Sequence, residues 1–169
     1  MRVYIPATLP LLARIAAAGE VASGSVAYAV TPALREWYPS GDAEELEYAA
    51  MTEAARDSLR QLAAEPDTHQ RRRVVIAADV PDTAVRPLSG PVHGGARGAV
   101  RVAAATAVRR FASVHVDGDG ARADIEAALG AVTAAAARDE EAQFLLDTVE
   151  GHELLWYTTQ EIPDLLRLG

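Results

Sequence analysis

The side chains best suited to recognition in this chain are two tryptophan–tyrosine pairs that lie in acidic segments far apart in sequence. Trp37 and Tyr38 lead into an acidic run that ends near Tyr48, and Trp156 and Tyr157 follow a second acidic run. Tryptophan, tyrosine and arginine are the usual anchors of protein interfaces. If the fold brings the two segments together, we expect one aromatic-acidic binding surface. Its expected members are Arg35, Glu36, Trp37, Tyr38, Glu47, Tyr48, His152, Glu153, Trp156 and Tyr157.

The same aromatic residues have a commoner structural role, which stays open at this point. Tryptophan and tyrosine often cover the edge of a sheet and point their polar tips toward water. The sequence does not say whether the two segments are neighbours in space, so it does not decide between the two roles.

Acid–base chemistry is the second option, and His152 is the histidine with the most acidic neighbours. His152 or Glu153 would be the catalytic base, Asp79 a second carboxylate and Arg35 the group that holds the substrate. Such a set would suit a small hydrolase or isomerase, cofactor-free or metal-assisted, that acts on an anionic small molecule. The competing interpretation of His152 is a surface histidine near the C-terminus of a helix, where it offsets the helix dipole.

The composition excludes several classes of enzyme. The chain has no cysteine, lysine or asparagine, and all sixteen of its cationic side chains are arginine. There is therefore no thiolate nucleophile, no cysteine-ligated zinc, no Schiff-base lysine and no phosphate-binding Walker lysine. We expect no cofactor.

The net charge of −8 opposes a general affinity for nucleic acid. Residues 36–67 contain nine acidic residues and two arginines, whereas residues 69–110 contain eight arginines and two aspartates. The arginines at 71–73 could form a basic patch, but mixed charge is ordinary on protein surfaces. We expect these arginines to pair with acidic segments elsewhere in the molecule.

Hydrophobic periodicity predicts a single α+β domain over residues 1–169, with a mixed β-sheet packed by helices. The chain reads as strand–helix–strand, a long helix, three strands, helices, a strand and a terminal helix. Expected strands cover residues 3–6, 25–30, 74–80, 99–102, 111–116 and 153–157, and expected helices cover 9–18, 121–138 and 140–149. The first strand–helix–strand unit has a loose echo in residues 111–157, which leaves open that the two halves are related.

The long helix after residue 41 has the clearest pattern. Asp42 and Glu45 make a capping box at its start. Apolar or small residues then recur every four positions and predict one buried face. The outward face is expected to carry Glu44, Glu47, Arg56, Asp57 and Arg60. In the later helix over residues 140–149 we expect Phe144, Leu145 and Val149 to be buried.

Residues 81–98 contain many glycines and prolines and no hydrophobic periodicity, so we expect a poorly packed loop. Gly94, Gly95 and Gly98 look permissive rather than required there, because no phosphate-binding pattern surrounds them. Residues 117–120 (DGDG) resemble the start of a calcium loop, but Ala121, Arg122 and Ala128 occupy the fifth, sixth and twelfth positions of that pattern. A turn from a strand into a helix is the better prediction.

The N-terminal residues read as a strand rather than as a signal peptide, and no apolar run is long enough to span a bilayer. We therefore expect a cytoplasmic protein that does not enter membranes. A homo-oligomer is left open.

The chain also resembles a family of small, uncharacterised actinobacterial proteins. The resemblance lies in residues 1–8 (MRVYIPAT), 29–38 (AVTPALREWY), 44–50 (EELEYAA) and 150–157 (EGHELLWY). It spans nearly the whole chain and implies one domain, but it implies no activity, cofactor or catalytic residue. The clustered aromatic and acidic residues, without a complete catalytic set, predict a non-catalytic binding or regulatory module, with a protein as the expected partner.

Overall fold

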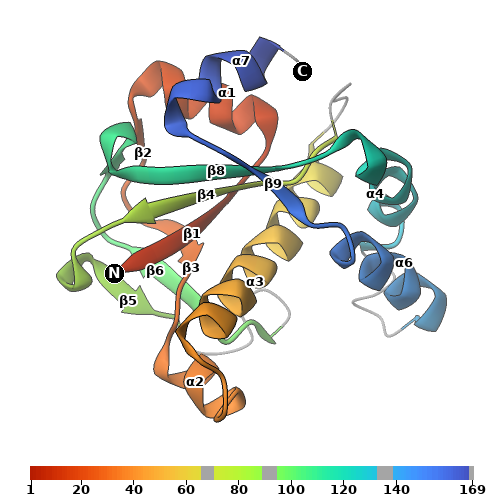
Figure 1. Cartoon of the computed structure of the whole chain (residues 1–169), viewed down its shortest axis with the longest axis horizontal. Helices are drawn as coiled ribbons and strands as arrows, with labels where there is room; N and C mark the ends of the chain where they lie inside the picture. The colour runs from red at the N-terminus through yellow and green to blue at the C-terminus, as the bar shows by residue number, and fades with distance from the viewer. Residues whose placement is uncertain (66–70, 89–94, 133–138, 168–169) are drawn as a thin grey trace.

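The computed structural model describes residues 1–65, 71–88, 95–132 and 139–167 (Figure 1). Seven strands form one fully antiparallel sheet in the order β5-β6-β3-β1-β4-β8-β9. Their bounds are β1 (Arg2–Ala7), β3 (Ser25–Tyr28), β4 (Val74–Asp79), β5 (Val85–Pro87), β6 (Ala99–Val102), β8 (Phe111–Asp117) and β9 (Leu154–Tyr157). Two short strands, β2 (Glu20–Val21) and β7 (Thr106–Ala107), form a separate ribbon.

The helices pack on both sides of this sheet, which confirms the expected single-domain α+β fold. They are α1 (Leu9–Ala18), α2 (Pro32–Trp37), α3 (Ala43–Ala64), α4 (Arg122–Leu129), α6 (Glu140–Glu150) and α7 (Ile162–Arg167). None of the helices in the described ranges is long and apolar enough to cross a membrane.

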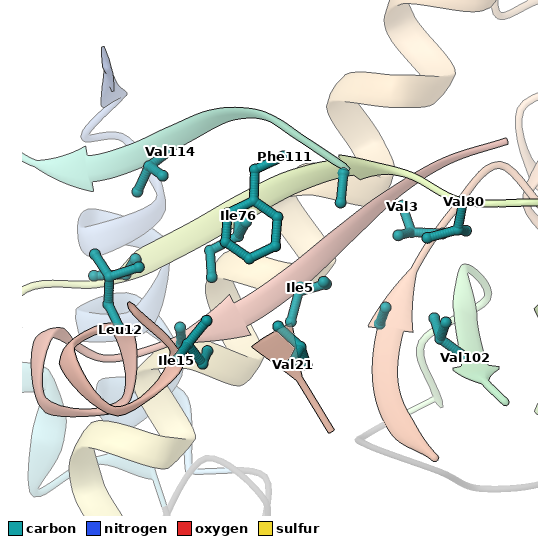
Figure 2. Close-up of a cluster of buried hydrophobic side chains, with 14 of the residues drawn as sticks. Val3, Ile5, Leu12, Ile15, Val21, Ile76, Val80, Val102, Phe111 and Val114 are labelled. Atoms are coloured by element: carbon teal, nitrogen blue, oxygen red, sulfur yellow. The ribbon is translucent and has the colours of Figure 1, made fainter. Parts of the chain in front are cut away.

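One face of the sheet is covered by α1 and α7, and the larger hydrophobic core lies beneath them (Figure 2). Helix α1 begins where the Thr8 hydroxyl accepts a hydrogen bond from the Leu11 amide at 3.3 Å. This N-cap sets the phase of the helix so that Leu12 and Ile15 point inward. They pack among Val3, Ile5, Val21, Ile76, Val80, Val102, Phe111 and Val114.

The opposite face of the sheet is covered by α3, which runs diagonally across it in Figure 1. The capping box of Asp42 and Glu45 is present, and the predicted four-residue stripe is buried. The expectation for Asp57 is wrong, because its side chain is buried rather than outward. Arg60 donates to Asp57 at 3.4 Å, so a positive charge lies beside the buried carboxylate.

Besides the hydrophobic cores on the two faces of the sheet, a smaller core joins α3 to α4 and α6 beside the sheet. Val149 is buried there as expected, but Phe144 is 69% exposed, so its predicted burial is wrong. Helix α6 instead buries Ala142 and Val149, seven residues apart, which turns Phe144 to the outside. The stretch 133–138, expected to be helical, lies outside the described residues.

The two strand–helix–strand units place their helices differently. Helix α1 packs with α7 on one face of the sheet, whereas α4 and α6 pack against α3 (Figure 1). The similar element order of the first unit and of residues 111–157 therefore does not place their helices at equivalent positions on the sheet.

The predicted poorly packed loop over residues 81–98 is wrong for its described parts. Residues Asp82–Ala84 form a 3-10 turn, and β5 then pairs with β6 as an edge strand. Residues 95–98 are held against α3 and α2 by contacts described below. Residues 89–94 of the predicted loop lie outside the described residues.

A buried ion pair joins the start of β4 to the end of β8. Arg73 and Asp117 are 2% and 0% exposed, and the guanidinium makes two hydrogen bonds to the carboxylate, at 2.9 and 2.7 Å. The same carboxylate accepts the Arg73 amide at 2.8 Å. The guanidinium also donates to the His152 carbonyl at 3.0 Å, ahead of β9. Arg72 binds Asp119 nearby, so this part of the basic segment pairs with an acidic one, as expected.

We expect Asp117→Ala to lower the free energy of unfolding by about 3–5 kcal/mol, because it leaves a buried guanidinium without its carboxylate. Asp79→Ala is the matched control, since it removes the carboxylate of the exposed pair between Arg2 and Asp79. Its expected cost is about 0–1 kcal/mol. Urea denaturation followed by circular dichroism measures both, and equal losses would contradict a special role for the buried pair.

Candidate functional site

Among the described residues, four of the five exposed large aromatic side chains gather around the N-terminal half of α3, and the fifth, Phe144, lies on α6. Trp37 and Tyr38, at the end of α2, are 58% and 47% exposed, Tyr48 on α3 is 54% exposed and Trp156 on β9 is 60% exposed. Tyr48 lines one groove with Trp37 and Tyr38, and another with Trp156. The two tryptophan–tyrosine segments thus lie on either side of the same helix. We call this region the α3 surface, made of Trp37, Tyr38, Tyr48, Trp156 and the residues between them.

On the Trp37 side, a carboxylate from α3 holds the chain between residues 95 and 98. The two oxygens of Glu53 accept the amides of Arg97 and Gly98 at 3.0 and 2.7 Å. The Arg97 guanidinium then lies over the Trp37 ring, 3.8 Å from its centroid. A guanidinium stacked on an indole is a favourable cation–π arrangement. This side of the surface therefore already binds an arginine of its own chain.

Gly98 is required at its position by a close approach of the backbone. A Cβ there would lie 2.8 Å from the Ala29 carbonyl oxygen and 2.8 Å from Glu53 Oε2. Gly95 has φ +87°, a left-handed conformation that favours glycine. Neither glycine is simply permissive, so that expectation is wrong for both.

On the Trp156 side, a groove of about 290 Å³ runs between α3 and the edge of the sheet. Met51 and Tyr48 form its α3 wall, and His115 on β8 lies at its floor beside Trp156, its partner across the strands. A neighbouring hollow continues past Trp156 to Arg2, Tyr4, Glu44 and Glu47. Both hollows share Tyr48, Met51, His115 and Trp156, so they form one elongated depression.

The polar groups in this depression hydrogen-bond to one another. His115 Nε2 lies 2.9 Å from Ser113 Oγ, two residues away on the same face of β8. Burial, and after it the positive charge of Arg2, lowers the pKa of His115, which keeps the imidazole neutral at pH 7. The Tyr4 hydroxyl donates to Glu47 at 3.2 Å. Burial first, and then the charge of Glu47, raises the pKa of Tyr4 to about 12.

His152 lies at the end of this groove and serves the packing of the fold. Its Nε2 lies 2.6 Å from Asp124 Oδ2 on α4, and its carbonyl accepts the Arg73 guanidinium. The sequence predicted neither partner, because Asp124 and Arg73 are 28 and 79 residues away. His152 therefore links α4 to the segment before β9 and contributes one wall of the groove.

The other expected site residues are divided between two sides of the protein. Glu47 and Glu153 border the depression with Trp156. Arg35 and Glu36 are exposed on α2, next to Trp37. Tyr157 points to the other face of the sheet and packs against the core under α1 and α7. The grooves beside α3 are thus lined by seven of the expected residues, Trp37, Tyr38, Glu47, Tyr48, His152, Glu153 and Trp156, and not by Arg35, Glu36 or Tyr157.

The expected catalytic set is not assembled. Asp79 is at one end of β4, hydrogen-bonded to Arg2 at 2.8 Å, and this bond lowers the pKa of its carboxyl group. His152 lies beyond the opposite end of the strand, beside Arg73. The groove of His152 is not lined by Arg35. Within the described ranges, no three histidine, aspartate or glutamate side chains are arranged to hold a metal.

Sequence reasoning missed two groups of residues. One is the pair of Glu53 and Arg97, whose only local signal is an acid on the exposed side of α3. The other is Tyr28, whose pKa is raised by burial and then by the charge of Asp57. Asp57 lies three residues after Ala54 and seven after Ala50, beside the stripe that α3 buries, and this spacing could have suggested its contact with Tyr28.

The chain belongs to a family of unknown function (DUF6912), and the match covers residues 1–166. Searches of curated proteins and of solved structures found no match. The family match confirms the expected resemblance to an uncharacterised family over nearly the whole chain.

We expect Gly98→Ala to destabilise the protein by roughly 1–3 kcal/mol, because the added Cβ must displace the Ala29 backbone or the Glu53 carboxylate. Gly130→Ala is the control, since a Cβ there meets nothing within 4 Å and the residue has helical dihedral angles. The control is expected to be neutral or slightly stabilising. Thermal unfolding of both variants measures the difference, and equal melting temperatures would show that residues 95–98 tolerate a Cβ.

The raised pKa of Tyr4 predicts a loss of stability at alkaline pH. Its folded-state pKa is raised from 10.0 to about 12, so the folded state keeps the phenol protonated where the unfolded state releases its proton. The stabilisation is complete below pH 10 and is lost as the pH rises toward 12. Tyr4→Phe should therefore flatten the fall in the free energy of unfolding between pH 10 and 12, measured by urea titrations at each pH. An unchanged slope would contradict the shifted pKa.

Proposed function

We propose that this protein is a non-catalytic binding or regulatory module whose α3 surface docks a partner protein. The observation that carries the proposal is the gathering of four exposed aromatic side chains, Trp37, Tyr38, Tyr48 and Trp156, around one helix. Exposed apolar patches on single domains mark interaction sites. We keep a cytoplasmic location as part of the proposal, as the sequence predicts.

The shape and composition of the surface also favour a protein partner. Two shallow grooves separated by Tyr48 offer pockets for side chains on both sides of a ridge. Aromatic anchors surrounded by polar groups are typical of the energetic centre of a protein interface. Tyrosine and tryptophan lose few torsional degrees of freedom on binding, so they contribute contact area at a low entropic cost.

The charge of the surface argues against nucleic acid as the partner. Glu44, Glu45 and Glu53 line the groove on the Trp37 side, and Glu150 and Glu153 line the groove on the Trp156 side. Binding to nucleic acid depends on cations that neutralise phosphates. Here the guanidinium groups of Arg2, Arg56 and Arg73 are bound to carboxylates of the chain itself.

We expect the double substitution of Trp37→Ala and Trp156→Ala to weaken binding of the partner by at least tenfold, because each tryptophan would be an interface anchor. The measurement is quantitative capture of proteins from the native host on tagged protein, followed by titration of the captured partner. Circular dichroism verifies that the variant is folded.

Phe144→Ala is the matched control, since Phe144 is also a large exposed aromatic residue but lies on α6. It should leave binding of the same partner unchanged. If the double variant retains the partner at full affinity, or if Phe144→Ala weakens it equally, the α3 surface is not the docking site.

A further inference from the structure

Strand β9 forms one edge of the seven-stranded sheet and is open on its outer side. Its residues, Leu154–Tyr157, pair with β8, and among the described residues no backbone hydrogen bond joins them to another segment. The opposite edge strand, β5, ends in Pro87, which has no amide proton to donate. Strand β9 has neither a proline nor a charged residue, the usual devices that block an edge.

The side chains of β9 make this edge apolar on both faces of the sheet. Trp156 is 60% exposed on the α3 side, and Leu155 is 48% exposed on the other side, close to Gly118. An added strand would place alternate side chains next to each of them. One set would lie beside Trp156 and the groove of about 290 Å³, and the other set beside Leu155.

The charges around the edge favour a basic occupant. Glu153 precedes β9, and Glu44 and Glu47 line the far end of the depression next to Trp156. The arginines at its two ends, Arg2 and Arg73, are bound to carboxylates of the chain. A second copy of the chain would bring the same acids against each other, whereas a basic segment would be attracted.

The Trp37 side of the α3 surface shows the kind of contact that such a segment can make. There Arg97 stacks on the indole at 3.8 Å while Glu53 holds its backbone amide. Trp156 presents an exposed indole with Glu153 and Glu47 nearby, but within the described ranges no arginine stacks on it. An arginine from a partner can supply the equivalent contact.

We propose that β9 accepts an extended segment of a basic partner protein as an eighth strand of the sheet. Main-chain hydrogen bonds to the open edge hold the segment, an arginine stacks on Trp156 within the acidic depression, and an apolar side chain packs on Leu155. This inference rests on the proposed function, because it names the class of partner and the way in which the α3 surface binds it.

The test uses a capped hexapeptide of alternating valine and arginine, titrated against the full chain by calorimetry. We expect saturable binding, slower amide hydrogen exchange over residues 154–157, and at least tenfold weaker binding by Trp156→Ala. Phe144→Ala should bind like the unaltered chain. A peptide in which glutamate replaces arginine should bind at least tenfold more weakly, which measures the charge preference.

A hexapeptide N-methylated at alternate residues separates strand addition from simple side-chain contact, because it keeps the side chains and loses the amide protons of one edge. Two such peptides block one edge each, and the peptide whose pairing edge is blocked should bind at least tenfold more weakly. Equal binding by both, equal binding by the glutamate peptide, or no binding by the valine–arginine peptide each overturns the inference.

Sedimentation equilibrium adds one more outcome. A dimer of the unaltered chain that is lost in Leu155→Glu would show that a second copy occupies β9, and it would overturn the basic-partner proposal. Failure of the inference is distinct from failure of the proposed function. If the peptides fail while a captured partner still depends on Trp37 and Trp156, the α3 surface binds proteins by another mode.

Discussion

The buried ion pair between Arg73 and Asp117 is the constraint on which the arrangement of the C-terminal half depends. The guanidinium binds the carboxylate at the end of β8 and the carbonyl of His152 ahead of β9. It therefore joins three segments that are far apart in sequence, each by a directional hydrogen bond. A buried ion pair is stable only when hydrogen bonds replace the water that both charges lose. Here several donors bind one carboxylate. This junction, together with the pairing of β9 with β8, fixes the position of β9 and of Trp156.

Helix α3 organises the other half of the protein and provides the ridge of the candidate site. Its buried face packs on the sheet through the hydrophobic core between the two, and Asp57 on this helix contacts Tyr28 on β3. Its exposed face carries Tyr48 between the two grooves and Glu53, which fixes the chain at Arg97. A single helix thus sets the relative position of both tryptophans. A binding surface built on such a rigid element needs little ordering when a partner docks, which favours affinity.

The cationic side chains around this surface already have partners within the chain. Arg2, Arg56 and Arg73 each bind a carboxylate, and Arg97 stacks on Trp37. The guanidinium group suits these roles because it is planar and donates in a fixed fork. Glu44 and Glu153 border the depression next to Trp156, so the site offers aromatic faces and negative charge to a partner. This combination connects the docking surface with the proposed basic strand.

The sequence by itself determined the fold class and the longer elements, but not the short strands β2, β5 and β7. The Asp42 and Glu45 capping box and the four-residue stripe of α3 are local patterns, and the structure confirms them. The sequence also singled out the two tryptophan–tyrosine segments, but it did not place Tyr157 on the opposite face of the sheet. The order of the strands decided that Trp37 and Trp156 lie on either side of one helix.

Only the tertiary structure decided which charged groups are buried and paired. Tyr28 contacts Asp57, and the Ala29 carbonyl closely approaches Gly98, so segments distant in sequence fix both residues. Periodicity and capping depend on neighbours within a few residues along the chain. The pairing of Arg73 with Asp117 spans 44 residues, and that of Arg56 with Glu150 spans 94. Contacts over such separations depend on how the sheet and helices pack, and no local pattern records them.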